Sequence, residues 1–182
     1  MALDADNQLN RLFAEVSRGE LRALEEVFAQ WERPVCNYAY SLVRNDEDAA
    51  DAVAEAMLGL LKLGRQLRAV RNPRAYLFGA VRHAALRGLR ERQGNGPTEA
   101  ADELARKPDP SQPDSTEALG VQDALMALPE EQREVVLLKV YGRLTFAEIA
   151  DVIHASPNTA ASRYRYAVEK LRRHLGDEDH GP

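Results

Sequence analysis

The chain has 182 residues, 45% of them hydrophobic and 29% charged, and a formal net charge of −5 at pH 7. This length fits one domain or two small ones, and no apolar run approaches the length that spans a membrane. The polar, acidic N-terminal residues argue against a secretory signal. Cys36 is the single cysteine, which excludes an internal disulfide, and the four histidines are scattered. We therefore expect a cytoplasmic protein without a metal site.

The charge is divided into blocks of opposite sign. Residues 1–60 have 5 basic and 12 acidic side chains, whereas residues 61–92 have 9 basic and 1 acidic. Residues 93–125 are acidic again, and residues 126–175 have a small positive excess. This segregation predicts one surface for a basic partner and another for phosphates.

Residues 1–92 are predicted to form a small helical domain. Apolar residues recur at helical spacing on both sides of Gly19, where we expect a break. Pro34 is expected to begin another helix, because proline is favoured in a first helical turn. Asn45 is expected to cap the next helix, whose first turn is acidic.

A basic and aromatic segment ends this domain. Asn72 and Pro73 have the pattern of a cap and a first-turn proline, and the helix that follows is expected to end near Arg92. Arginines interleaved with an aromatic ring suit melted nucleic acid, because guanidinium groups bind phosphates while the ring stacks on an unpaired base. A solvated basic helix with a half-buried tyrosine is the alternative. The candidate nucleic-acid residues are Arg65, Arg68, Arg71, Asn72, Arg74, Tyr76, His83, Arg87 and Arg90.

The helix that follows Asn45 has a row of acidic side chains. Acids in a first turn are expected from the helix dipole alone. Asp51 and Glu55 lie one and two turns further in, so they extend a negative ridge that suits a basic protein partner. The candidate partner-binding residues are Asp46, Glu47, Asp48, Asp51 and Glu55.

Residues 93–120 are predicted to be a linker. They are rich in proline, glycine, serine and aspartate and have no apolar periodicity. The chain is thus predicted to be all-α, with two small helical domains on a flexible tether. The second domain spans residues 121–176, and an acidic tail follows at residues 177–182.

The second domain has the helix signals of a helix-turn-helix. Pro129 is expected to open one helix, and Gly142 to close it in a left-handed conformation. Thr145 and Glu148 form a T-x-x-E capping box. Ser156 precedes a proline, which predicts the start of the last helix. Because only two or three residues separate the last two helices, a crossed pair that enters a DNA groove is favoured.

The last helix has two faces. Its predicted buried stripe is Ala160, Tyr164, Ala167, Leu171 and Leu175. Polar and aromatic side chains lie near the start of this helix, which is the part of a recognition helix that usually contacts base edges and phosphates. His154 occupies the turn, where one residue needs a positive φ. An ordinary amphipathic helix with a solvated face is the alternative. The candidate DNA residues here are Thr145, Ser156, Asn158, Thr159, Ser162, Arg163, Arg165 and Tyr166.

The order of these features resembles the extracytoplasmic-function (ECF) group of sigma-70 family transcription initiation factors. The features that carry the likeness follow one another along the chain. They are an acidic-capped helix, the basic segment NPRAYLFGAVRHAALRGLR, a linker, and then the segments LPEEQREVVLL, LTFAEIA and SPNTAASRYRYAVEKL. It implies that residues 1–92 act like sigma region 2, with the acidic helix on the β′ clamp helices of core RNA polymerase. The basic segment would then recognise and melt the −10 promoter element.

The resemblance further implies that residues 121–176 act like region 4, which contacts the polymerase β flap and the −35 element in duplex DNA. An anti-sigma factor is a further candidate partner, and no cofactor is implied. We expect no enzymatic activity, since no catalytic motif is present. Ala161 departs from the family pattern, where a basic residue is frequent. Two alternatives stay open: a helix-turn-helix regulator that acts without polymerase, and a polymerase-binding adaptor that does not contact DNA.

Overall fold

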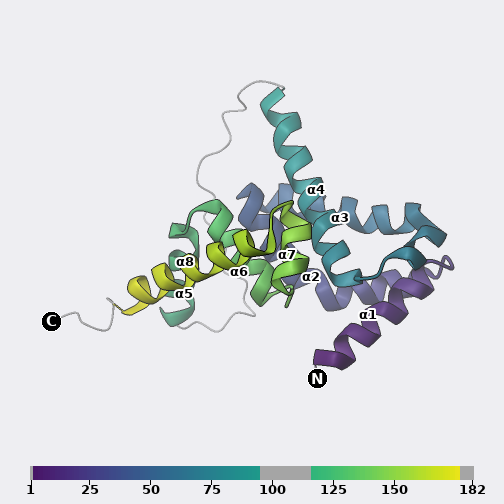
Figure 1. The fold of residues 1–182 in the computed structure, drawn as a ribbon. Coiled ribbons are helices and arrows are strands. Elements are labelled where there is room, and N and C mark those ends of the chain that lie inside the picture. The colour runs from purple at the N-terminus through teal and green to yellow at the C-terminus, as the bar shows by residue number, and fades with distance from the viewer. Residues whose placement is uncertain (1, 95–115, 177–182) are drawn as a thin grey trace.

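The computed structural model describes residues 2–94 and 116–176, and every regular element in them is helical (Figure 1). The all-α prediction is confirmed. No helix in these two ranges is both long and apolar enough to cross a membrane. The first range holds α1 (Ala2–Val16), α2 (Leu21–Val43), α3 (Asp46–Leu63), the 3₁₀ turn η1 (Gly64–Ala69) and α4 (Pro73–Gly94). The second holds α5 (Thr116–Ala127), α6 (Glu130–Val140), α7 (Phe146–Ile153) and α8 (Pro157–Gly176).

In the N-terminal domain, α2 packs against α1, α3 and α4. Gly19 separates α1 from α2 with a φ of +88°, as the sequence predicts. Trp31 and Tyr38 from α2 each meet the ring of Phe78 from α4 edge-on, with centroids 6.1 and 5.3 Å apart. These aromatic contacts join α2 and α4 at the centre of the core.

The prediction that Pro34 begins a separate helix is wrong. Pro34 lies inside α2, which runs without interruption from Leu21 to Val43. A proline inside a helix costs on the order of 3 kcal/mol, because it removes a hydrogen bond and crowds the preceding turn. Here the buried stripe continues in register on both sides of the proline, through Val27, Trp31, Val35, Tyr38 and Leu42. Burial of that one continuous face outweighs the local cost.

In the C-terminal domain, the turn between α6 and α7 differs from the prediction in detail. The left-handed residue is Arg143, with a φ of 50°, and not Gly142. Gly142 serves close packing instead, because a Cβ atom there would lie 2.5 Å from the carbonyl oxygen of Leu138. The turn between α7 and α8 is as expected: His154 adopts a φ of 56° and donates its backbone N–H to the Ala150 carbonyl.

The buried stripe of α8 is confirmed except at its end. Ala160 and Ala167 are fully buried, and Tyr164 and Leu171 are partly buried. Leu175 is 38% exposed, so its predicted burial is wrong. It lies in the last turn of α8, which ends at Gly176.

The two domains pack against each other. Helix α6 contacts α2, and α7 contacts α4, so the C-terminal domain lies against the N-terminal one (Figure 1). One hydrophobic cluster continues through both: it includes Phe78 and Val81 of α4 together with Val135 and Leu138 of α6 and Ile149 of α7. In this arrangement the domains share a core.

Candidate nucleic-acid and polymerase interfaces

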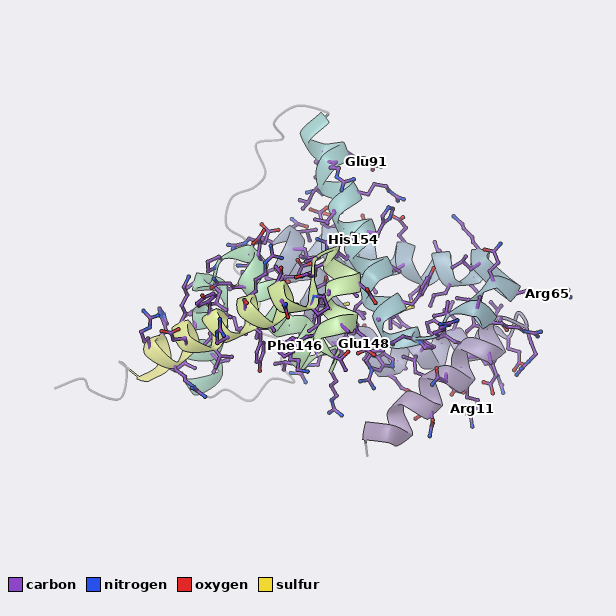
Figure 2. All side chains as sticks on the ribbon, viewed as in Figure 1. Arg11, Arg65, Glu91, Phe146, Glu148 and His154 are labelled. Carbon is purple, nitrogen blue, oxygen red and sulfur yellow. The ribbon has the colours of Figure 1, made fainter. Side chains whose placement is uncertain are left out.

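The predicted nucleic-acid residues of the N-terminal domain occupy different environments. Arg65 and Arg71 are exposed, and Arg65 lies at the outer end of the domain (Figure 2). Arg68 is also exposed, but its Nε donates to the Ser17 hydroxyl at 3.2 Å. His83 and Arg90 are exposed on α4. Arg65, Arg71, His83 and Arg90 are therefore the members of this set that are exposed and have no side-chain hydrogen bond or ion pair within the described residues.

Two members of the same set pack against the core: Arg74 is buried and Tyr76 is partly buried. Arg74 is only 7% exposed, and its guanidinium lies 5.3 Å from the centroid of the Trp31 ring. Tyr76 meets Phe13 edge-on, with centroids 6.3 Å apart, and its burial raises the pKa of the phenol above the usual 10. These contacts stabilise the N-terminal domain and restrict both side chains.

Asn72 connects the start of α4 to the other domain. Its Oδ1 accepts the backbone N–H of Ala75 at 3.0 Å, which caps the helix. Its Nδ2 donates to a carboxylate oxygen of Glu148 from α7. The other oxygen of Glu148 accepts the Thr145 backbone N–H at 2.7 Å, so one glutamate closes the capping box and contacts Asn72.

The acidic ridge of α3 is partly neutralised by α4. Glu55 forms an ion pair with Arg87, and Asp48 forms one with Arg92. Asp46, Glu47 and Asp51 are exposed. Between α3 and α4 lies a groove of about 350 Å³, lined by acids on one side and by Ala84, Ala85, Gly88 and Leu89 on the other. Arg87, predicted from sequence to contact nucleic acid, thus faces the acidic ridge.

The helix-turn-helix presents a polar face at the start of α8. The Ser156 hydroxyl accepts the Thr159 N–H at 3.0 Å and caps the helix. Asn158, Arg165 and Tyr166 are exposed, and the Arg165 guanidinium lies 5.3 Å from the Tyr166 ring centroid. Thr145 and Ser156 are exposed as well. Three of the predicted residues are less accessible: Thr159 and Ser162 are half-buried, and Arg163 pairs with Glu131 at 2.7 Å.

Sequence reasoning missed a buried polar cluster between the domains, which we call the polar junction: Tyr38, Arg82, Arg133 and Glu134. Glu134 Oε1 accepts both the Tyr38 hydroxyl and Arg82 Nε at 2.9 Å. Arg133 Nη2 donates to the Ser41 carbonyl at 3.1 Å, and its Nη1 to the Leu128 carbonyl at 3.2 Å.

Burial governs the electrostatics of the polar junction. It raises the pKa of Tyr38 well above 10, and the nearby Glu134 charge adds to this effect. It also lowers the pKa of Arg133 from its usual value. The sequence contains one signal for this cluster, the run QREVVLL. In it two charged residues, Arg133 and Glu134, directly precede an apolar stretch, and both are buried in the fold.

A second cavity, of about 300 Å³, lies where the domains meet. It is lined by Asn10 of α1, by Arg71, Asn72 and Arg74 around the start of α4, by Arg143, Leu144 and Thr145 of the α6–α7 turn, and by Glu148 of α7. The predicted nucleic-acid segment of one domain therefore faces the beginning of the helix-turn-helix of the other.

The fold is that of a two-domain helical protein whose second domain contains a helix-turn-helix. Two family models match it: sigma-70 region 2 over residues 27–94 and sigma-70 region 4 over residues 119–171. The ECF RNA polymerase sigma factor SigM of Mycobacterium tuberculosis is 30% identical over 165 residues, covering 91% of this chain and 83% of SigM. The RNA polymerase sigma factor SigV of Bacillus subtilis is 26% identical over 144 residues, covering 78% and 84%.

The chain belongs to the ECF group of the sigma-70 family, and it is a transcription initiation factor that directs promoter recognition by RNA polymerase. Two solved structures share its fold. The sigma factor RpoE of Bartonella quintana, in complex with the anti-sigma factor NepR, has a TM-score of 0.68 at 20% identity, over 84% of this chain and 96% of RpoE. CnrH, in complex with the cytosolic domain of CnrY, has a TM-score of 0.62 at 19% identity, over 93% and 98%.

Proposed function

We propose that this sigma factor binds polymerase and promoter DNA through three separate surfaces. The exposed acids of α3, with the groove beside them, bind core RNA polymerase. The segment around η1 and the start of α4 binds the melted −10 element, and the start of α8 binds duplex DNA at the −35 element. The observation that carries this proposal is the separation of exposed charge: acids gather on α3, while Arg71 and Arg165 are exposed on different domains.

The proposed division assigns different chemistry to the two DNA surfaces. At the start of α8, Asn158 and Arg165 have the donors needed to contact base edges and phosphates in a major groove. Around η1, Arg65 and Arg71 supply charge that suits the phosphates of a single strand. The protein contributes binding energy in the cytoplasm, where polymerase acts, and leaves bond formation to the polymerase.

In vitro transcription tests the proposal as a whole. Core polymerase and this protein are combined on genomic promoter fragments, and start sites that depend on the protein are mapped. We expect at least one such start. Its complete absence would contradict the proposal, and a protein that binds operators without polymerase would then be the better description.

Two variants test the surfaces separately. Asp51→Arg reverses an exposed charge on the ridge and should weaken core binding, whereas Glu26→Arg, which reverses an exposed charge on α2, should not. Arg65→Ala combined with Arg71→Ala should impair open-complex formation while core binding persists. Arg74 is left intact, because it packs on Trp31. Equal loss of both activities would show that the −10 surface lies elsewhere.

We also propose an inhibitory protein partner, since RpoE and CnrH were each solved with a bound protein and share this fold. A candidate inhibitor should abolish the protein-dependent start in the same transcription assay. It should do so without affecting transcription that another sigma factor directs from its own promoter.

A further inference from the structure

The cavity of about 300 Å³ between the domains has more basic than acidic groups in its wall. Its charged lining residues are Arg71, Arg74, Arg143 and Glu148. Glu148 is labelled in Figure 2 and marks the place of the cavity. Three guanidinium groups and one carboxylate leave the wall with a net charge of +2. Both oxygens of that carboxylate already accept hydrogen bonds, one from Asn72 Nδ2 and the other from the Thr145 backbone N–H.

Two of these arginines have guanidinium groups that are available to a ligand. Arg71 and Arg143 are exposed, and within the described ranges neither has a side-chain hydrogen bond or ion pair. Arg74 contributes its charge from a buried position over the Trp31 ring. Asn10, on α1, is exposed and lines the same cavity with its amide group. Hydrogen-bond donors from both domains therefore converge on one cavity.

Two helices also begin at this cavity. Asn72 caps α4 and Thr145 caps α7, and both caps line the cavity. The N-terminal end of a helix has a partial positive charge and unpaired backbone N–H groups, so it favours an anion. The Thr145 hydroxyl oxygen accepts the Glu148 N–H, which leaves the hydroxyl hydrogen free to donate. The two helix ends thus add to the positive potential of the arginines.

The composition of the wall indicates the kind of anion. Arginine forks bind the oxygens of phosphate and carboxylate groups in pairs. Small-molecule sites range from about 300 to about 1,000 Å³, and this cavity lies at the lower end. Its apolar lining is Leu9, Pro73 and Leu144, and no aromatic ring is among the described residues that line it. A nucleobase would have no ring on which to stack, so a compact ligand with more than one negative charge fits best.

We propose that this cavity is a binding site for a small phosphorylated molecule of the diphosphate class, held by Arg71 of one domain and Arg143 of the other. Because its donors belong to both domains, a bound ligand also stabilises the packing of one domain on the other. Arg71 is shared with the proposed −10 surface. Arg143 and Glu148 have no part in the proposed promoter contacts, so the site can be tested apart from them.

Isothermal titration calorimetry of the full chain with inorganic pyrophosphate, at low salt and without magnesium, tests the site. Arg143→Asn removes one guanidinium, and asparagine tolerates the left-handed backbone of this position, where φ is 50°. We expect the affinity to weaken by about tenfold or more. Arg44→Asn is the matched control, because Arg44 is also exposed and left-handed, with a φ of 55°, but does not line the cavity. It should leave the affinity unchanged.

Glu148→Gln tests the site in the opposite direction. It removes the carboxylate from the wall and frees the Asn72 amide, while glutamine is also accepted in a capping box. We expect pyrophosphate to bind about fivefold more tightly, because a like charge beside the ligand is removed. Asp151→Asn is the control: Asp151 is exposed on the same helix and does not line the cavity. A variant that only loosened the fold would not gain affinity.

The site is overturned if wild type gives no saturable heat with pyrophosphate. Equal weakening in Arg143→Asn and Arg44→Asn would also overturn it, because the effect would then be one of overall charge. An unchanged or weaker affinity in Glu148→Gln would show that the ligand binds away from this wall.

Arg65→Ala separates this site from the proposed −10 surface, since Arg65 does not line the cavity. It should weaken binding of single-stranded poly(dT) and leave pyrophosphate binding unchanged. If poly(dT) responds while pyrophosphate does not bind wild type, the −10 surface stands and the diphosphate site fails. If pyrophosphate binds as expected and poly(dT) does not respond to Arg65→Ala, the diphosphate site stands and the contribution of Arg65 to the −10 surface fails.

Discussion

The two segments that we propose to contact DNA differ in how much of their positive charge is accessible. Residues 61–92 have the higher density of basic side chains, yet many of them are bound within the protein. Arg68 contacts Ser17, Arg74 covers Trp31, Arg82 bonds to Glu134, Arg87 pairs with Glu55, and Arg92 pairs with Asp48. On α8 the charge is sparser, but Arg165 is exposed beside Tyr166 at the start of the helix. The charge of a segment therefore overstates its capacity for phosphate, because arginine also packs and forms ion pairs.

The sharpest test of this difference is Arg74→Ala against Arg71→Ala. Arg74 is 7% exposed on Trp31, so its truncation removes buried packing and a cation–π contact. We expect a loss of about 2–3 kcal/mol in the free energy of unfolding. Arg71 is exposed, and its truncation should change that free energy by less than about 0.5 kcal/mol. Urea denaturation measures both. Equal stability of the two variants would mean that Arg74 is accessible and that the comparison is wrong.

The α6–α7 turn gives the next largest effect, in the C-terminal domain. Gly142→Ala would place a Cβ atom 2.5 Å from the Leu138 carbonyl oxygen, so the turn must shift. We expect a loss of about 1–3 kcal/mol in the free energy of unfolding. Gly88→Ala in α4 is the control: nothing lies within 4 Å of its added Cβ atom, and the helix should gain about 0.5–1 kcal/mol. A neutral Gly142→Ala would show that the turn relaxes without cost.

Local chemistry explains which parts of the fold the sequence could predict. Asn45, Thr145 with Glu148, and Ser156 each cap a helix through a partner three residues away, so their spacing was visible in the chain. His154 adopts the expected left-handed conformation for the same local reason. The starts of α7 and α8 and the end of α7 followed from such signals. In contrast, α5 begins at Thr116, inside the predicted linker, and the left-handed residue after α6 is Arg143 and not Gly142.

Long-range burial explains what the sequence could not predict. Tyr38 and Glu134 are 96 residues apart, and Arg133 and Ser41 are 92 apart, so no local pattern marks them as partners. Pro34 stays inside α2 because burial of the continuous apolar face of this helix outweighs the local cost of the proline. A rule based on proline alone does not include that burial. For the candidate sites, residue type and spacing indicated the DNA and polymerase surfaces, but only the fold shows that Arg74 and Arg87 have contacts of their own.

Alkaline pH should weaken the domain contact through Tyr38. Its folded pKa lies well above 10 because of burial and the Glu134 charge, whereas the unfolded phenol titrates near 10. Between these values the unfolded state loses a proton that the folded state keeps. Stability is therefore complete below about pH 10 and falls as pH rises above it, with a limiting slope of about 1.4 kcal/mol per pH unit.

Urea denaturation of wild type and Tyr38→Phe between pH 8 and 11 isolates this contribution, because the other tyrosines are common to both proteins. The difference in unfolding free energy should be constant up to about pH 10 and then shrink. Parallel curves over the whole range would mean that Tyr38 is accessible to water in the free protein. The two domains would then be apart in the folded protein, and Tyr38 would not contact Glu134.

The smallest expected effect is that of Arg71→Ala, which removes an exposed charge. We expect a change in the salt dependence of its affinity for single-stranded DNA, with an unchanged free energy of unfolding. If Arg71 contacts one phosphate of a melted strand, Arg71→Ala removes about 0.7 from the magnitude of the slope of log affinity against log salt. Arg11→Ala, an exposed arginine on α1 that pairs with Glu15 of its own helix, is the matched control and should leave the slope unchanged. The affinity for a fluorescent single-stranded poly(dT) 15-mer, measured at several salt concentrations, gives both values. Because Arg71 is exposed and Arg74 is buried, a slope change in Arg71→Ala without lost stability would show directly that only part of this basic segment is available to DNA. An unchanged slope would move the phosphate contact to Arg65 or beyond the segment.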